Sequence, residues 1–309
     1  MVTGGCGFIG SHVVRRLLSE GVGEVVVVDS LRYGRIENLD PQDARVTIVQ
    51  HTLGRDPIAA LRPGLERCDY LMHLAAEKHN QSKGTPRDLM DTNVSGSFEL
   101  FQLAGQCGVK GTLFASSLYA YGRTRGDAMR EDMLPEPQTL YGISKLSGEH
   151  LLRFLAEETV MRYACVRLFF VYGPRQFSGL GYKSVIVKNF ERIARGDPPV
   201  ILGDGQQVLD YVYVDDTVEM LLRALLTEGL PPVLNIGSGI GVSIRELTAS
   251  MLEVAGSNLV PVHGPPDWTQ GTQRVADVSI ARNLLKWTPQ VPLRAGLERA
   301  YAWILEAIS

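Results

Sequence analysis

Two segments near the middle of the chain carry side chains that could act on a hydroxyl group. Residues 116–122 read Ser-Ser-Leu-Tyr-Ala-Tyr-Gly, and residues 141–145 read Tyr-Gly-Ile-Ser-Lys. Four residues make about one helical turn, so the Lys145 ammonium can lie beside the Tyr141 phenol and lower its pKa from about 10 toward neutrality. A phenolate is a base that can remove a proton from an alcohol. The spacing alone is weak evidence, because Tyr and Lys so placed also occur on solvated helix faces.

A glycine-rich stretch at the start of the chain favours binding of a dinucleotide. Residues 3–10 read Thr-Gly-Gly-Cys-Gly-Phe-Ile-Gly, with Gly4, Gly7 and Gly10 three residues apart. Such glycines allow a tight turn, so that a pyrophosphate can lie at the N-terminus of the following helix. Asp29 ends the next predicted strand, where its carboxylate can bind the adenosine ribose and repel a 2′-phosphate. This favours NAD over NADP; the alternative for Asp29 is a cap or a solvated loop residue.

The hydrophobic pattern predicts an α/β fold with a doubly wound parallel sheet. Short β-branched runs alternate with helical patterns, and Val25–Val28 is apolar throughout, as in a strand covered on both faces. We expect strands at 25–28, 46–49, 70–74, 112–115, 164–168 and 233–236, and helices at 11–20, 88–107 and 141–158. His73, in the third of these strands, is interpreted as a core histidine.

After residue 172, Gly and Pro become more frequent and the predicted elements become shorter. We therefore expect a cofactor-binding domain at 1–172, with returning segments near 206–228 and 233–238. A smaller, interleaved C-terminal substrate-binding lobe would comprise 173–205 and 239–309.

The composition narrows the possible classes of protein. The 309 residues are 45% apolar and carry a net charge of −3, with a pI near 6.1, which argues against nucleic acid as a partner. Cys6, Cys68, Cys107 and Cys165 show no metal-ligand spacing, so we expect reduced thiols, no metal and a cytoplasmic location. No membrane span or signal peptide is expected, and the first strand is short enough to suggest a truncated start.

Taken together, these motifs resemble the extended short-chain dehydrogenase/reductase family, in particular its NAD-dependent nucleotide-sugar epimerase/dehydratase branch of UDP-glucose 4-epimerase-like enzymes. The resemblance covers essentially the whole chain and implies a Rossmann fold. Besides the segments above, it rests on His73–Ala76, Asn93–Gly96, Tyr172–Arg175, Gly203–Gly205, Tyr213–Asp216, Asn235–Gly237 and Leu285–Pro289.

The resemblance implies a role for each matching residue. Tyr141 would be the general base, Lys145 would hold the nicotinamide ribose, and Ser117 would bind the substrate hydroxyl. Lys78 would lie on the cofactor and near the substrate. The residues implied in cofactor binding are Gly4, Gly7, Phe8, Ile9, Gly10, Asp29, Ser30, Thr52, Leu53, Leu74, Ala75, Ala76, Lys78, Asn93, Ser116, Tyr141 and Lys145.

The family implies that Tyr141 removes a proton from a sugar hydroxyl while hydride passes to the nicotinamide of NAD. The simplest outcome is epimerisation of a nucleotide-activated sugar, at C4, through a transient ketone. The alternative is a dehydratase or a net oxidoreductase that uses the same residues, possibly on an atypical substrate. A non-catalytic dinucleotide-binding regulator is disfavoured because Tyr141 and Lys145 are both present.

Two departures from the family pattern bear on the reaction and on the substrate. Dehydratases and decarboxylases of the family carry acids at the positions of Leu118 and Tyr119, so their absence favours epimerisation. Tyr119 would either pack against the sugar or act as an acid/base group itself. The usual Asn and Arg that bind the diphosphate are replaced by Phe170 and Leu209. We expect substitutes among Lys183, Lys188, Arg175 and Arg274.

The predicted helices at 88–107 and 141–158 carry apolar stripes. Relatives pair such helices across a two-fold axis, which implies a homodimer, whereas the alternative is that the stripes only cover the sheet.

Overall fold

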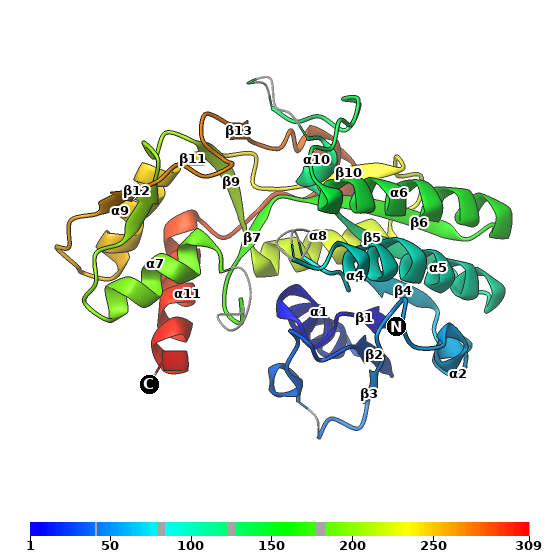
Figure 1. Ribbon diagram of the computed structural model, residues 1–309. Helices are drawn as coiled ribbons and strands as arrows, with labels where there is room; N and C mark the ends of the chain where they lie inside the picture. Colours follow the sequence, from blue (N-terminus) through cyan, green and yellow to red (C-terminus); the bar gives the residue numbers. More distant parts are fainter. Residues whose placement is uncertain (41, 79–83, 123–125, 127, 177–182, 309) are drawn as a thin grey trace. The chain divides into compact units, whose positions relative to one another are not determined.

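The computed structural model describes residues 1–40, 42–78, 84–122, 126, 128–176 and 183–308 (Figure 1). Its contacts divide the chain into two compact units. Unit 1 comprises Met1–Arg123, Met133–Leu168 and Val218–Leu234, and unit 2 comprises Thr124–Asp132, Phe169–Thr217 and Asn235–Ser309. Residues 206–217 and 235–238, which the sequence interpretation grouped with the cofactor-binding part, are assigned to unit 2.

Within the described part of the chain, seven strands form the central sheet, in the order β10-β6-β5-β4-β1-β2-β3. The pairs from β6 to β3 are all parallel. This confirms the expected α/β class and its parallel sheet. The strands are β1 (Val2–Thr3), β2 (Val25–Asp29), β3 (Val46–Gln50), β4 (Tyr70–His73), β5 (Gly111–Ser117), β6 (Arg162–Leu168) and β10 (Val233–Ile236).

The helices of unit 1 bury apolar side chains. They are α1 (Phe8–Ser19), α2 (Arg62–Leu65), α4 (Pro86–Met90), α5 (Ser97–Gln106) and α6 (Leu140–Thr159), with α8 (Val214–Leu226) mostly in this unit. α5 and α6 lie side by side (Figure 1). Val26 and Val28 of β2 share a core cluster with residues of α5 and α6, while Val25 and Val27 are buried outside that cluster. Burial of successive residues explains why the strand is apolar throughout.

The predicted helix at 88–107 is confirmed, and it contains a π-helical segment, Asp91–Gly96, between α4 and α5. This segment packs closely on the turn at Leu53–Gly54. A Cβ at Gly54 would lie 2.1 Å from the Asp91 carbonyl oxygen, and a Cβ at Gly96 would lie 2.6 Å from the Gly54 nitrogen. The long-range approach of these two backbones has no signal in the helical periodicity.

Unit 2 is built around small sheets. Within its described residues, β7 (Phe170–Tyr172), β9 (Val208–Tyr213), β11 (Gly241–Ser243) and β13 (Gln273–Arg274) form one sheet, and β8 (Val200–Leu202) pairs with β12 (Val262–Gly264). The helices are α7 (Val185–Ala194), α9 (Ile244–Val254), α10 (Ser279–Leu285) and α11 (Leu293–Ile308). The buried Asp210 carboxylate of β9 accepts backbone N–H bonds from Ser238, Gly239 and Ala276, which ties three segments together. None of the described helices combines the length and the apolar character needed to span a membrane.

His73 is a core residue, as the sequence interpretation proposed. Its two ring nitrogens hydrogen-bond to Thr3 Oγ1 at 2.7 Å and to Ser97 Oγ at 2.9 Å, joining β1, β4 and α5. Its ring packs on Phe101 and Phe114. Burial lowers the pKa of His73 from 6.5 to about 3, so the folded protein holds this imidazole neutral.

Stability should therefore depend on pH through His73. Below pH 6.5 the unfolded chain binds a proton at this residue that the folded chain does not, so stability falls as the pH drops toward 3. We expect the free energy of unfolding of the wild type to fall more steeply than that of His73→Gln, by about 1 kcal/mol per pH unit. Urea titrations over this pH range measure the difference, and parallel slopes would contradict the prediction.

Candidate functional site

Ser117, Tyr141 and Lys145 come together where the end of β5 meets the first turns of α6. α6 begins after Thr139, whose side chain accepts a hydrogen bond from the Gly142 N–H at 3.0 Å. This cap places Tyr141 in the first turn of the helix, and a hydrogen bond joins the Tyr141 and Ser117 side chains. Ser117 is the last residue of β5. The two segments that the sequence singled out therefore meet in one site.

The Lys145 ammonium is buried between the same two elements. Its Nζ donates to the Ala115 carbonyl oxygen at 2.8 Å. It also lies 5.7 Å from the centroid of the Tyr141 ring and 4.9 Å from that of Phe114. The lysine is therefore held against the backbone that leads into Ser117, one helical turn from the phenol.

Burial dominates the acid/base properties of both residues. Packing around the half-buried Tyr141 raises the pKa of its phenol to about 12, and the hydrogen bond with Ser117 opposes that rise. Burial lowers the pKa of Lys145 to about 7, and the Glu149 carboxylate opposes that fall. The sequence predicted that Lys145 would lower the pKa of Tyr141, whereas in this structure burial raises it. A further positive charge beside the phenol would favour the phenolate.

Tyr119 lies against the candidate base. Its ring meets the Tyr141 ring edge to face, with centroids 5.5 Å apart, and its backbone N–H donates to Ser117 Oγ at 3.3 Å. Leu118 is buried. The two positions where an acidic residue would assist elimination therefore hold a phenol that packs on Tyr141 and a core leucine.

The glycine-rich loop has the shape of a cradle for a phosphate group. A Cβ at Gly10 would lie 2.1 Å from the Gly4 carbonyl oxygen, and a Cβ at Gly4, which has φ +69°, would lie 2.9 Å from the Ala75 nitrogen. Gly7 precedes α1, and within the described residues no side chain caps that helix. Its first N–H groups, at Phe8, Ile9 and Gly10, are thus suited to bind an anion, which fits the pyrophosphate of a dinucleotide.

Asp29 connects that loop to the end of β2. Its Oδ2 accepts from the Cys6 N–H at 3.0 Å, and its Oδ1 accepts from the Leu31 N–H at 2.9 Å. Burial raises the pKa of this carboxyl, while the two backbone hydrogen bonds lower it. Asp29 thus shapes the loop around the expected ribose position, next to Ser30.

The other residues expected at the cofactor follow β3 and β4 or lie in the π-helical segment. Thr52 donates its N–H to Asp56, and Leu53 is buried beside it. Asn93 accepts from the Glu77 N–H, donates to the Glu77 carbonyl and donates to Ser144 of α6. Lys78 lies over the Tyr33 ring, with 4.9 Å between Nζ and the centroid. Leu74, Ala75 and Ala76 follow β4 directly, at the end where β1 carries the glycine loop.

The cationic candidates of unit 2 differ in their surroundings. Lys183 is already bound to the Glu191 carboxylate, with N–O distances of 2.9 and 2.6 Å. Arg274, in β13, pairs in register with Leu209 of β9, and its guanidinium lies 5.1 Å from the Trp268 ring centroid. Arg175 follows β7 with φ +63°, and Lys188 belongs to α7. Leu209 is buried, so the position where relatives carry an arginine is here part of the core of unit 2.

Sequence reasoning overlooked Ser116, Glu149 and Arg167 as a connected group. Ser116 Oγ donates to Glu149 Oε1 at 2.5 Å, and Glu149 forms a buried two-bond ion pair with Arg167. The sequence spacing could have pointed to Glu149, because Tyr141, Lys145 and Glu149 follow one another every four residues and so lie on one face of the helix. Among the residues that the structure describes, no cluster of His, Cys, Asp and Glu could hold a metal ion.

Comparisons with known proteins show which family and which proteins this chain resembles. A sequence profile of the NAD dependent epimerase/dehydratase family matches residues 1–237. The chain is 32% identical to a UDP-glucose 4-epimerase of Mycolicibacterium smegmatis, over 97% of this chain and 96% of that protein. Its structure is similar to the crystal structure of UDP-glucose 4-epimerase from Thermotoga maritima with UDP-glucose, with a TM-score of 0.92. The two sequences are 34% identical, and the match covers 100% of this chain and 99% of that chain. The chain is also 30% identical to a UDP-glucuronic acid decarboxylase of Arabidopsis thaliana, over 97% of this chain and 68% of that protein.

The close packing of the glycine-rich loop predicts that a larger side chain at Gly10 weakens NAD binding. Gly10→Ala places a methyl group into the Gly4 carbonyl and should push α1 away from the loop, weakening NAD binding by at least about tenfold. Gly23→Ala is the matched control, because a Cβ there meets no atom within 4 Å. NAD released from the purified, denatured variants can be measured by absorbance. Equal NAD content in both variants would show that the loop does not hold the dinucleotide.

Proposed function

Because this chain belongs to the NAD-dependent epimerase/dehydratase family, we propose that it epimerises C4 of a nucleotide-activated sugar through a transient ketone, with Tyr141 as the base. The observation that carries this proposal is the joining of Tyr141, Ser117 and Lys145 at the edge of the parallel sheet that also carries the glycine-rich loop, within unit 1. Relatives that are UDP-glucose 4-epimerases support the choice of C4.

The proposed reaction divides the work among three side chains. Tyr141 takes the proton of the C4 hydroxyl, and Ser117, hydrogen-bonded to that phenol, binds the same hydroxyl and orients it. Lys145 contributes a positive charge near the ring and binds the nicotinamide ribose. NAD, when bound, supplies the hydride acceptor and donor, together with a positive charge that favours the Tyr141 phenolate. Return of hydride to the other face of the ketone inverts the carbon.

Leu118 and Tyr119 support epimerisation over elimination or decarboxylation. Removing a proton next to the ketone needs a base, and within these two positions the only titratable group is the Tyr119 phenol. Its edge-to-face packing on Tyr141 supports a role in shaping the pocket. The decarboxylase relative makes net sugar modification the alternative outcome to test.

We also propose that unit 1 binds NAD and unit 2 binds the nucleotide part of the substrate. In addition we propose a homodimer through α5 and α6. The supporting observation is that α6 exposes Ile143 and Phe154, the latter with 57% of its surface accessible. Such exposed apolar side chains on a helix are typical of a partner-binding face.

The assignment of Tyr141 can be tested with purified protein and a panel of UDP-sugars followed by NMR. The wild type should interconvert a C4 pair without net NADH formation. Tyr141→Phe should lower turnover by about 10²- to 10⁴-fold and keep NAD bound, because it removes only the acid/base hydroxyl. Tyr119→Phe, which preserves the ring contact, should retain most turnover.

Three outcomes would contradict this function or the assignment. Retained turnover in Tyr141→Phe would reject Tyr141 as the base. Net NADH formation would identify an oxidoreductase, and loss of a sugar substituent or of CO₂ would identify a dehydratase or decarboxylase.

For the diphosphate we propose Arg274 as the substitute for the missing arginine at position 209. The register of β13 and β9 sets Arg274 directly beside Leu209, and paired residues of neighbouring strands project to the same face. Arg274 is largely buried and lies against Trp268, which supports a held guanidinium. Lys183 is a weaker candidate because Glu191 already neutralises it.

Arg274→Gln should raise the KM for the UDP-sugar by about 10- to 100-fold and change kcat much less, since the lost contact is to a non-reacting group. Arg282→Gln, an exposed arginine of α10, is the control and should behave as the wild type. Steady-state kinetics of both variants give the answer. An unchanged KM in Arg274→Gln would place the diphosphate elsewhere.

A further inference from the structure

Behind the candidate base, unit 1 buries an ion pair that the proposed reaction does not use directly. Arg167 of β6 donates to the Glu149 carboxylate through Nε at 2.9 Å and through Nη2 at 2.7 Å. The two side chains are only 3% and 5% exposed. The Arg167 guanidinium also stacks over the Tyr121 ring, 4.3 Å from its centroid.

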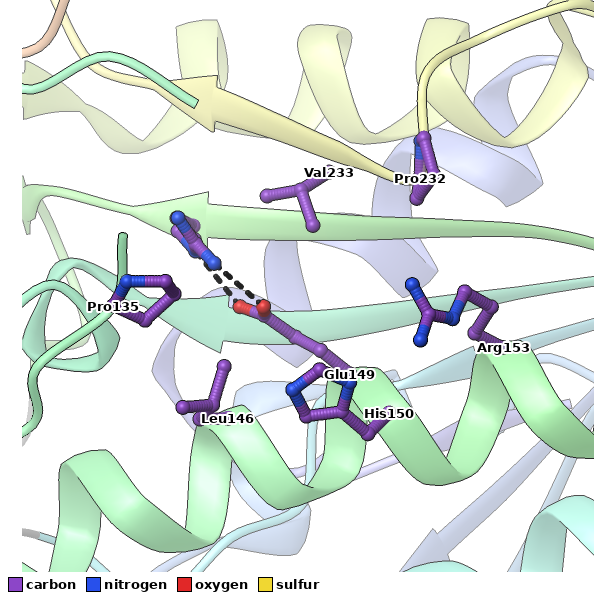
Figure 2. Close-up of a pocket in the computed structure, with 8 residues that line it drawn as sticks. Pro135, Leu146, Glu149, His150, Arg153, Pro232 and Val233 are labelled. Atoms are coloured by element: carbon purple, nitrogen blue, oxygen red, sulfur yellow. Dashed lines mark hydrogen bonds and ion pairs between the residues drawn. The ribbon is translucent and has the colours of Figure 1, made fainter. Parts of the chain in front are cut away.

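The ion pair lies in a pocket between α6 and the strands (Figure 2). The dashed lines in Figure 2 mark its two bonds, and the same pocket is lined by His150, Arg153 and Leu146 of α6 together with Pro135, Pro232 and Val233. The pocket lining is thus mostly apolar or cationic. Glu149 is the one carboxylate among these lining residues.

A buried ion pair is an expensive way to stabilise a protein. Removing two charges from water costs several kcal/mol per ion, and apolar residues of similar size often give equal or greater stability. If these two positions only filled space in the core, hydrophobic side chains would stabilise the fold equally well. A role for the charges themselves accounts better for Glu149 and Arg167.

Glu149 reaches the site through the backbone of β5. Its Oε1 accepts the Ser116 hydroxyl at 2.5 Å, and Lys145, one turn earlier on α6, donates to the carbonyl of Ala115 at 2.8 Å. α6 therefore holds the two residues that directly precede Ser117, one by its carbonyl and the next by its side chain. Since Ser117 also bonds to Tyr141, the position of the reacting hydroxyls depends on both attachments.

Glu149 also acts on the charge of Lys145. The groups that face Lys145 are Glu149 and Tyr141 on α6, the Ala115 carbonyl and Phe114 on β5, and His73 on β4. Of these, the Glu149 carboxylate is the anion that favours the ammonium form, and it opposes the effect of burial. The groups that face Glu149 are Arg167 and Cys165 on β6, Ser116 on β5, and Lys145, His150 and Arg153 on α6.

We propose that Glu149 is a positioning residue: held in place by Arg167, its carboxylate fixes Ser116 and hence Ser117, and it acts on Lys145, one helical turn away on α6. This inference rests on the proposed function of Ser117, Tyr141 and Lys145. It adds a residue pair that touches neither the reacting atoms nor the cofactor.

Glu149→Gln tests the proposal in the NAD-loaded enzyme. Removing the carboxylate should lower the pKa of Lys145 further, so Lys145 loses its proton at a lower pH. The alkaline limb of the kcat profile should therefore move to lower pH by about one unit, and kcat at its optimum should fall by about tenfold. The KM for the UDP-sugar should stay within about twofold of the wild type. Glu157→Gln, an exposed glutamate of the same helix, is the control and should reproduce the wild-type profile.

Two further variants guard against a merely structural effect. Glu149→Met combined with Arg167→Met leaves no unpaired buried charge, so it should fold, and it should show the same shift of the alkaline limb. Ser116→Ala removes the hydroxyl that donates to Glu149 and keeps the Glu149–Arg167 ion pair, so it should lower kcat by a few-fold and leave the limb in place. A folded double variant with wild-type kcat and pH profile would overturn the proposal. If neither Glu149 variant folds, an unchanged kcat in Ser116→Ala would overturn it.

Failure of the proposed function and failure of the Glu149 proposal give different results. A wild type that epimerises no UDP-sugar would reject that function. The pH dependence of NADH binding, followed by fluorescence, would then still test the link from Glu149 to Lys145. We expect binding by Glu149→Gln to weaken at a lower pH than binding by the wild type, and coincident curves would reject the link.

Discussion

The close packing of α6 on the end of β5 is the constraint on which the rest of the site depends. Gly148 permits it, because a Cβ at that position would lie 2.4 Å from the Phe114 ring. At this distance the Lys145 side chain reaches the Ala115 carbonyl, Glu149 reaches Ser116, and Tyr141 reaches Ser117. Three side chains spaced one turn apart on a helix thus contact three successive residues of one strand. A wider spacing between the two elements would separate all three pairs together.

Glycines act in a similar way at the cofactor end of unit 1. The Gly4 to Gly10 contact brings the start of α1 onto the loop after β1, and Asp29 holds the same loop from β2. Parallel strands place these loops at one edge of the sheet, where dinucleotides bind in doubly wound folds. The geometry of the loop and the family membership therefore lead to the same cofactor from independent observations.

The departures from the family pattern acquire a physical meaning in the structure. Leu209 belongs to the core of unit 2, so an arginine could not simply be restored there without burying its charge. The strand beside it carries Arg274, which offers the same chemistry from a different position in the sequence. In unit 1, Tyr119 packs on the candidate base where related enzymes place an acid. Such exchanges keep Ser117, Tyr141 and Lys145 and change the residues around them.

The sequence by itself determined the α/β class, the parallel sheet, the family and the NAD preference. Each of these follows from patterns that are local along the chain: an apolar strand, a glycine spacing, or a Tyr and a Lys one turn apart. Only the tertiary structure decided the π-helical segment at Asp91–Gly96 and its packing on Gly54, the pairing of Arg274 with Leu209, and the Glu149–Arg167 ion pair. It also decided that burial raises the pKa of Tyr141, opposed by the hydrogen bond with Ser117. These properties arise where distant segments meet, and neither burial nor the approach of two backbones is encoded in the spacing of a single motif.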